Sequence, residues 1–205
     1  MKIYLVRHGQ NEDNKNGILN GHRDLPLTDL GYEQALNLAK HLKSENQKFD
    51  LVLSSPLMRA YDTAVKITNE LNLADPVKEN LLIERNFGVM SGEKIEDIPK
   101  LCGKNVFQTD TILYFLNPEG AETFPDLLVR AEKLLKKIEL EYSDKNEILL
   151  VGHGDFGKML YAKYYSLDWK YVLKNFHFGN SEMIVLDKNL AKNDRFYFKQ
   201  IQHNH

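Results

Sequence analysis

The chain has 205 residues, of which 42% are hydrophobic and 27% are charged, and these values predict one folded domain over residues 1–205. Its 27 Lys and Arg against 29 Asp and Glu give a formal net charge of -2, which excludes the basic excess that non-specific nucleic-acid binding needs. The single cysteine, Cys102, excludes an internal disulfide framework, and no apolar run approaches the roughly 18 residues that span a membrane.

The N-terminal segment "MKIYLVRHG" has an apolar run that is too short for a signal peptide. A single cysteine also suits a reducing compartment. We therefore expect a cytoplasmic protein with no nucleic-acid or membrane partner, in which any anion site is local.

Short, β-branched apolar stretches predict strands at 2–7, 49–54 and 147–151. They are apolar on both faces, as expected for strands of a parallel sheet that helices cover on both sides. Two more strands are predicted at 182–187 and 195–201, where they can form a closing hairpin. The second of these alternates as an edge strand would.

Amphipathic segments predict helices at 28–43, 56–71 and 124–138. Thr28 is the expected N-cap of the first, and Ser55 that of the second, with Pro56 at the first helical position. Alternating strands and helices predict an α/β fold with a mostly parallel central sheet and helices on both faces, a three-layer αβα arrangement. Residues 86–118 are the least regular part, and we interpret them as an irregular excursion over the active face.

Two strands end in the same way, because "IYLVRHG" and "ILLVGHG" each place His-Gly just beyond an apolar run. Ligands of open α/β sheets bind outside the carboxyl ends of the strands. His8 and His153 are therefore expected to converge. Arg59, in the first turn of the helix after a third strand, is expected to face the same crevice as Arg7.

A cluster of two guanidinium and two imidazole groups suits phosphoryl transfer, which depends mostly on positioning and on electrostatic stabilisation of the phosphoryl oxygens. Arginine supplies forked donors for those oxygens. A neutral imidazole can attack phosphorus if its other nitrogen is held by an acceptor, such as a backbone carbonyl in the turn at Gly9. In this hypothesis His8 attacks and His153 donates a hydrogen bond. A single histidine at a strand end is more often a hydrogen-bonded polar residue than a catalyst, and a single arginine after a strand is usually part of a surface ion pair.

A G-x-G-x-x-G pattern at Gly152, Gly154 and Gly157 offers a different interpretation, a dinucleotide site. That fingerprint normally opens the first βαβ unit and needs an acidic residue at the end of the next strand, roughly 20 residues on. Asp168 does not stand at such a strand end. We interpret the glycines as turn residues around His153 and expect no cofactor.

The segment "LVRHGQNEDNKNGILNGHRDLPLTDLGYEQA" resembles the extended signature of the histidine phosphatase superfamily, in its phosphoglycerate mutase-like branch. The segments "SSPLMRAYDTA", "LLIERNFGVMSG", "PEGAETFPDLLVRA", "LLVGHGD" and "FGNSEMIVLD" are similar to further blocks of that family. The resemblance covers nearly the whole chain and implies the phosphoglycerate mutase-like fold, with one histidine phosphatase domain over residues 1–205.

The resemblance implies that His8 becomes phosphorylated and that Glu84 protonates the leaving oxygen. It also implies that the phosphoryl group is held by Arg7, Asn14, Arg59 and His153. A general acid near neutral pH needs a raised pKa, whereas nearby arginines lower it, so a bound phosphate dianion would have to offset them. The alternative for Glu84 is an exposed ion pair with Arg85 or another base.

These residues predict a phosphomonoester phosphatase that acts on a small phosphorylated metabolite through a phosphohistidine intermediate. A cofactor-dependent phosphoglycerate mutase is the nearest alternative, and a non-catalytic phosphate-binding module is a third. Residues 86–118 have Lys94, Lys100 and Lys104 but no arginine, which equips them weakly to clamp a bisphosphate and favours hydrolysis. The sequence identifies neither the leaving group nor the oligomeric state.

No metal is expected, because His22, His41 and His177 lack ligand spacing and "HNH" at 203–205 is interpreted as a tail.

Two residues depart from the family pattern. Asn11 stands where Ser or Thr is common, so an amide is expected to replace a hydroxyl contact to phosphate. Asp155 stands where a small residue is usual, and its carboxylate is expected to discriminate against highly charged substrates.

Overall fold

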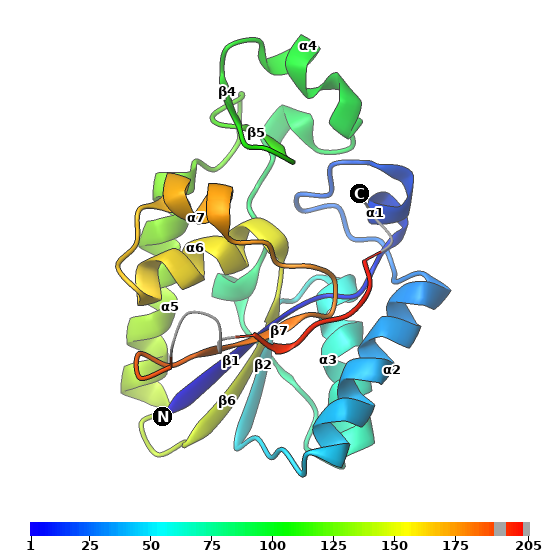
Figure 1. Cartoon of the computed structure of the whole chain (residues 1–205), viewed down its shortest axis with the longest axis vertical. Coiled ribbons are helices and arrows are strands. Elements are labelled where there is room, and N and C mark those ends of the chain that lie inside the picture. Colours follow the sequence, from blue (N-terminus) through cyan, green and yellow to red (C-terminus); the bar gives the residue numbers. More distant parts are fainter. Residues whose placement is uncertain (191–195, 203–205) are drawn as a thin grey trace.

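A computed structural model describes residues 1–190 and 196–202. Within these residues one sheet has the order β3-β2-β6-β1-β7-β8 (Figure 1). Its strands are β1 (Lys2–Arg7), β2 (Leu51–Ser54), β3 (Val77–Lys78), β6 (Glu147–Gly152), β7 (Met183–Leu186) and β8 (Phe196–Phe198). The first four of these are parallel, and β7 and β8 pair antiparallel as the predicted hairpin. Arg195 of the last predicted strand and the tail at 203–205 lie outside the described residues.

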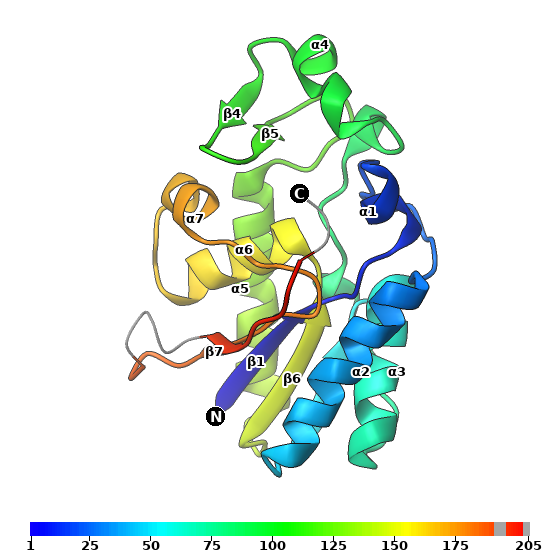
Figure 2. The ribbon, with the colours of Figure 1, turned by 45° about the vertical axis from the view of Figure 1, so that its right-hand side comes forward.

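Helices cover both faces of the sheet, which confirms the predicted three-layer arrangement (Figure 2). On one face lie α2 (Asp29–Ser44) and α3 (Met58–Leu71), and on the other α5 (Phe124–Glu141), α6 (Gly154–Tyr164) and α7 (Trp169–Asn175). Alternate residues of β1 supply the two cores, since Tyr4 packs with Leu38 while Leu5 packs with Phe124. Strands that are buried on both faces are apolar throughout, as their sequences predicted.

The two predicted N-caps have different outcomes. The Thr28 hydroxyl oxygen accepts a hydrogen bond from the Gly31 N–H at 3.0 Å, which confirms the cap of α2. The prediction for Ser55 is wrong, because α3 begins at Met58 after Leu57 and has no side-chain cap. The Ser55 hydroxyl instead lies 2.7 Å from the buried imidazole of His153, a partner that the local sequence does not contain.

The pairing of β1 with β6 brings the two His-Gly ends together. Arg7 lies opposite Gly152 in the register, and the His8 N–H donates to the Gly152 carbonyl at 2.9 Å. His8 and His153 therefore leave the sheet side by side at its carboxyl edge. This arrangement follows from the parallel direction of the two strands.

Residues 86–118, called here the lobe, are more regular than their composition predicted. They contain the short helices η2 (Gly88–Met90), η3 (Ile95–Asp97) and α4 (Ile98–Cys102) and the hairpin of β4 (Val106–Gln108) and β5 (Leu113–Phe115). Phe87, Met90, Ile98 and Phe115 pack with Leu19 in a separate small core. Figure 1 shows the lobe at the end of the molecule beyond the carboxyl ends of the parallel strands.

A close backbone contact fixes the turn after His8. A Cβ atom built on Gly31 would lie 2.0 Å from the Gln10 carbonyl oxygen, closer than any real contact. Gly31→Ala is therefore expected to lower the free energy of unfolding by about 1–3 kcal/mol, since backbone must move to admit the methyl group. Chemical denaturation measures this, with Asn37→Ala on the exposed face of α2 as the control. Equal stability of the two variants would contradict this contact.

Candidate active site

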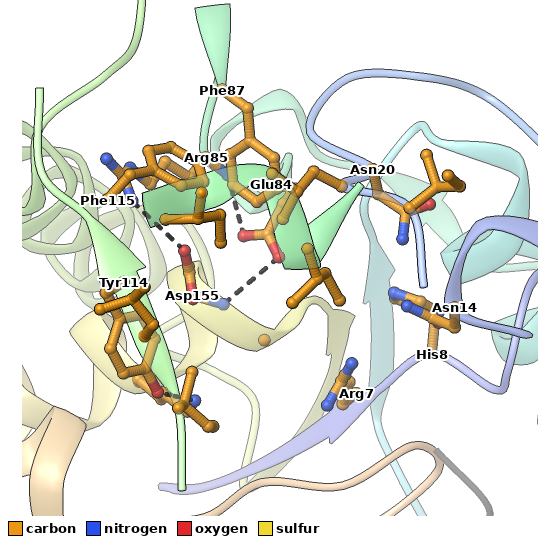
Figure 3. A pocket seen from close by; sticks show the side chains of 18 of the residues that line it. Arg7, His8, Asn14, Asn20, Glu84, Arg85, Phe87, Tyr114, Phe115 and Asp155 are labelled. Atoms are coloured by element: carbon orange, nitrogen blue, oxygen red, sulfur yellow. Dashed lines mark hydrogen bonds and ion pairs between the residues drawn. The ribbon is translucent and has the colours of Figure 1, made fainter. Parts of the chain in front are cut away.

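Beyond the carboxyl ends of β1 and β6 lies a cavity of about 200 Å³ (Figure 3). The predicted site residues that line it are Arg7, His8, Asn14, Arg59 and Glu84. His153 is fully buried beside them, and the centroid of its ring lies 5.1 Å from that of His8. Residues from four distant parts of the chain thus surround one point, as the sequence predicted.

The His8 imidazole is held as a neutral base. Its Nδ1 lies 2.6 Å from the Gly9 carbonyl oxygen, which can only accept, so Nδ1 carries the ring proton. Its Nε2 accepts a hydrogen bond from Arg59 Nε at 3.2 Å. Burial, followed by the charges of Arg59 and Arg7, lowers the pKa of His8 well below its usual value. At neutral pH Nε2 is therefore unprotonated, and its lone pair can attack phosphorus once Arg59 Nε turns from this nitrogen to a phosphoryl oxygen.

Both arginines are anchored by backbone carbonyls. Arg59 donates from Nη1 to the Arg23 carbonyl at 2.7 Å and from Nη2 to the Gly21 carbonyl at 2.9 Å. Burial lowers its pKa to about 10, so it stays charged at neutral pH. Arg7 donates from Nη1 to the Phe178 carbonyl at 2.8 Å, whereas its buried Nε has no hydrogen-bond partner within the described chain. Arg7 lines the cavity with this donor unused.

His153 has one nitrogen engaged and one free of protein partners within the described part of the chain. Its Nε2 lies 2.7 Å from the Ser55 hydroxyl, and its Nδ1 is buried without a hydrogen-bond partner. The Ser55 oxygen accepts from the Leu57 N–H at 3.3 Å, so its own hydrogen can be donated to Nε2. In that arrangement Nδ1 carries the ring proton and can donate it to an anion. Sequence reasoning missed this contact of Ser55.

The Glu84 carboxylate is buried at the N-terminal end of α6. Oε1 accepts from the N–H groups of Arg85 at 2.8 Å and Phe156 at 3.0 Å, and Oε2 from that of Asp155 at 3.3 Å. Burial and, next, the Asp155 charge raise the pKa of Glu84, against the lowering effect of these backbone bonds and of Arg59. A raised pKa is what a proton donor near neutral pH requires.

Arg85 does not form the exposed ion pair with Glu84 that was the alternative for that residue. Its side chain is fully buried, and Nη1 lies 3.6 Å from Asp155 Oδ2. The Glu122 and Leu116 carbonyls accept from its Nε and Nη2 at 2.7 and 2.6 Å. Asp155 is therefore the carboxylate that forms the ion pair with Arg85, a contact that the sequence did not indicate.

Asparagines support the site from two sides. The side-chain oxygen Oδ1 of Asn14 accepts hydrogen bonds from the Asn11 backbone N–H at 3.4 Å and from Asn180 Nδ2 at 3.3 Å. Asn14 also lines the cavity, and its side-chain NH₂ group is the donor it can offer there. Asn180 Nδ2 also donates to the His8 carbonyl at 2.9 Å, a contact that sequence reasoning missed.

Asn11 is not among the residues that line the cavity, so its expected contact with phosphate stays a prediction. The Asn11 side chain is fully buried, caps α1 (Glu12–Asn16) and donates to Asn20 Oδ1 at 2.6 Å. Its polar atoms are therefore used in holding the loop after His8 rather than in lining the cavity.

The glycines of the G-x-G-x-x-G pattern have separate structural roles. Gly152 ends β6 and Gly154 begins α6, on either side of His153, as turn residues would. Gly157 lies inside α6, where an added Cβ atom would be 3.0 Å from the Phe178 ring, so its interpretation as a turn residue is wrong. It permits close packing of the helix.

Residues 1–190 and 196–202 lack two features. Among their side chains there is no cluster of three or more His, Cys, Asp or Glu that could hold a metal ion. None of their helices combines the length and apolar character needed to cross a membrane.

Comparisons with known proteins found similar sequences and similar structures. The sequence model of the histidine phosphatase superfamily (branch 1) matches residues 3–196. A 2,3-bisphosphoglycerate-dependent phosphoglycerate mutase of Rhizobium etli is 31% identical over 156 residues, which cover 75% of each chain. The α-ribazole phosphatase of Shigella flexneri is 28% identical with a TM-score of 0.75, covering 90% of this chain and 89% of that one. A phosphoserine phosphatase of Entamoeba histolytica, solved with phosphoserine, is 25% identical with a TM-score of 0.70 over 90% and 89% of the chains.

Proposed function

Since the chain belongs to branch 1 of the histidine phosphatase superfamily, we propose that it hydrolyses small phosphomonoesters through a phosphohistidine at His8. The observation that carries this proposal is the 2.6 Å contact of His8 Nδ1 with the Gly9 carbonyl, which leaves Nε2 as the unprotonated nitrogen. The Gly9 carbonyl fixes the proton on Nδ1, and burial, followed by the charges of Arg59 and Arg7, lowers the pKa of His8 and keeps the ring neutral. A buried neutral imidazole that feels the charges of two guanidinium groups is an activated nucleophile for a phosphoryl group.

The proposed reaction has two steps. In the first, His8 Nε2 attacks phosphorus, the bond to the ester oxygen breaks, and Glu84 gives its proton to that oxygen as the alcohol leaves. In the second, water attacks phosphorus, the P–N bond breaks, and the water proton passes to the Glu84 carboxylate. Inorganic phosphate leaves and both side chains return to their starting states. Donors from Arg7, Arg59 and His153 stabilise the phosphoryl oxygens in both steps.

Hydrolysis and transfer differ in whether the phosphoryl group is retained. The named mutase relative favours transfer. The lobe favours hydrolysis, because it lines the cavity with Phe87, Ile95, Ile98, Ile112, Leu113, Tyr114 and Phe115. Its lysines, Lys94, Lys100 and Lys104, are not among the lining residues, so the lobe offers no cation to hold a bisphosphate. We therefore propose a phosphatase, with a mutase as the second candidate.

Phosphate release and phosphorus NMR distinguish the two candidates. The purified protein is incubated with a panel of phosphomonoesters that includes 3-phosphoglycerate and fructose bisphosphates. A phosphatase releases inorganic phosphate, whereas a mutase produces 2-phosphoglycerate from 3-phosphoglycerate with little release. Neither product from any ester would contradict both candidates and favour a phosphate-binding role.

No metal takes part in the proposed steps, so phosphate release is expected to continue unchanged in excess EDTA. Phosphate is measured directly by a colorimetric reaction, because coupling enzymes often need Mg²⁺ themselves. A loss of activity with EDTA that Mg²⁺ or Zn²⁺ restores would contradict the metal-independent mechanism.

The relatives' names refer to different compounds, namely phosphoglycerate, phosphoserine and α-ribazole. We propose a small phosphorylated metabolite as the substrate class. The cytoplasmic location stays a prediction, for which the free thiol of Cys102 is the supporting feature.

A further inference from the structure

Lys158 is a buried cation in the cavity wall to which the proposed reaction gives no part. It lies in the middle of α6, is 5% exposed, and lines the cavity. Its Nζ donates a hydrogen bond to the Tyr114 hydroxyl of β5 at 2.7 Å. Among the described residues no carboxylate lies within ion-pair distance of this ammonium group.

A buried ammonium without a counter-ion is costly, because its attraction to a neutral phenol does not replace the lost hydration. Burial lowers the pKa of Lys158 to about 8, with Arg7 acting in the same direction and Asp155 and Glu84 against it. The charged form is thus poised to be stabilised by an anion that enters the cavity. The remaining N–H groups of the ammonium are the donors for it.

The ammonium lies on the leaving-group side of the cavity. In Figure 3, His8 and Asn14 lie on one side, Tyr114 and Asp155 on the other, and Arg7 between them. The hydrogen bond to Tyr114 places the Lys158 ammonium on the side away from His8. A phosphoryl group held at His8 therefore leaves this side to the rest of the ester.

We propose, on the basis of the proposed phosphatase function, that Lys158 binds a carboxylate of the leaving group, so that the substrates are phosphate esters of hydroxy acids. One ammonium neutralises one carboxylate. A second phosphoryl dianion would leave excess negative charge close to Asp155 and Glu84, which disfavours bisphosphates. In this proposal the positive charge of the Lys158 ammonium on α6 selects the class of substrate.

Matched pairs of esters test this inference. The kcat/KM values are measured for 3-phosphoglycerate against glycerol 3-phosphate and for phosphoglycolate against ethyl phosphate. The wild type is expected to favour the carboxylate member of each pair by about tenfold or more, the usual worth of a hydrogen-bonded charge. Lys158→Met is expected to bring this ratio close to one. Lys94→Met, an exposed lysine of the lobe, should keep the wild-type ratio.

A second measurement needs no variant and holds even if Lys158→Met fails to fold. In the wild type, the carboxylate preference is expected to fall as the pH rises past about 8, where Lys158 loses its proton in the empty cavity. Glu84 serves both members of a pair, so its titration cancels in the ratio. The other groups that face Lys158 are Tyr114, Asp155 and Arg7.

The inference is overturned if the wild type shows no preference for the carboxylate member of each pair. It is also overturned if folded Lys158→Met keeps the wild-type ratio of kcat/KM values, even where both values fall by the same factor. A preference that stays constant through pH 8 would also overturn it. These outcomes differ from failure of the proposed function, in which the wild type releases phosphate from no ester.

Discussion

Replacing His8 with alanine is expected to reduce phosphate release from every ester by about 10⁴-fold or more, because the variant cannot form the covalent intermediate. The Gly9 carbonyl and Arg59 orient this one ring, and the neighbouring His153 cannot substitute for it. His153 Nε2 is already engaged by the Ser55 hydroxyl in the interior of the protein. The measurement is the initial rate of phosphate release, with one ester present in each assay.

Chemical trapping separates loss of the nucleophile from loss of the fold. Wild-type protein quenched during turnover should carry an acid-labile phosphoryl group, and His8→Ala should carry none. His41→Ala is the matched control, since that ring packs against Tyr197 and Phe198 away from the cavity. Hydrolysis of all substrates by a folded His8→Ala variant at the wild-type rate would refute the phosphohistidine mechanism.

The strand-end histidines were predictable because their signals are local. An apolar run followed by His-Gly is visible within a few residues, and parallel strands bring their carboxyl ends to one edge. The register of β1 with β6 then places His8 beside His153. The helices on both faces followed equally from periodicity, since their apolar faces repeat along each segment.

The supporting contacts were not predictable, because each joins positions far apart in the chain. Ser55 bonds His153 across 98 positions, and Asn180 bonds His8 across 172. Ser55 before Pro56 has the local pattern of a helix cap, and tertiary contact with a buried imidazole overrides that preference. Lys158 and Tyr114 come from α6 and the lobe, and only their packing in three dimensions shows that the lysine lines the cavity.

Glu84→Gln is expected to lower kcat for alkyl phosphates by about 10²–10⁴-fold, the usual contribution of a general acid. Glutamine keeps the shape of the carboxylate but has no proton to give to the departing oxygen. p-Nitrophenyl phosphate should lose much less in the phosphorylation step, because p-nitrophenolate leaves as a stable anion. Equal losses on alkyl and aryl esters in that step, measured by pre-steady-state release of p-nitrophenol, would contradict the acid role.

The pH dependence of kcat is a second test of the proton that Glu84 donates. Burial and the Asp155 charge raise the pKa of Glu84, which favours its protonated form, so kcat for alkyl esters is expected to fall only as the pH rises through that raised value. Asp155→Asn removes the neighbouring negative charge and weakens the hold on Arg85, and both changes stabilise the Glu84 carboxylate. The basic limb of the profile should therefore move to lower pH in this variant. The acidic limb should stay below the usual histidine range, because the pKa of His8 is lowered. A basic limb that does not move in folded Asp155→Asn would show that another group titrates there.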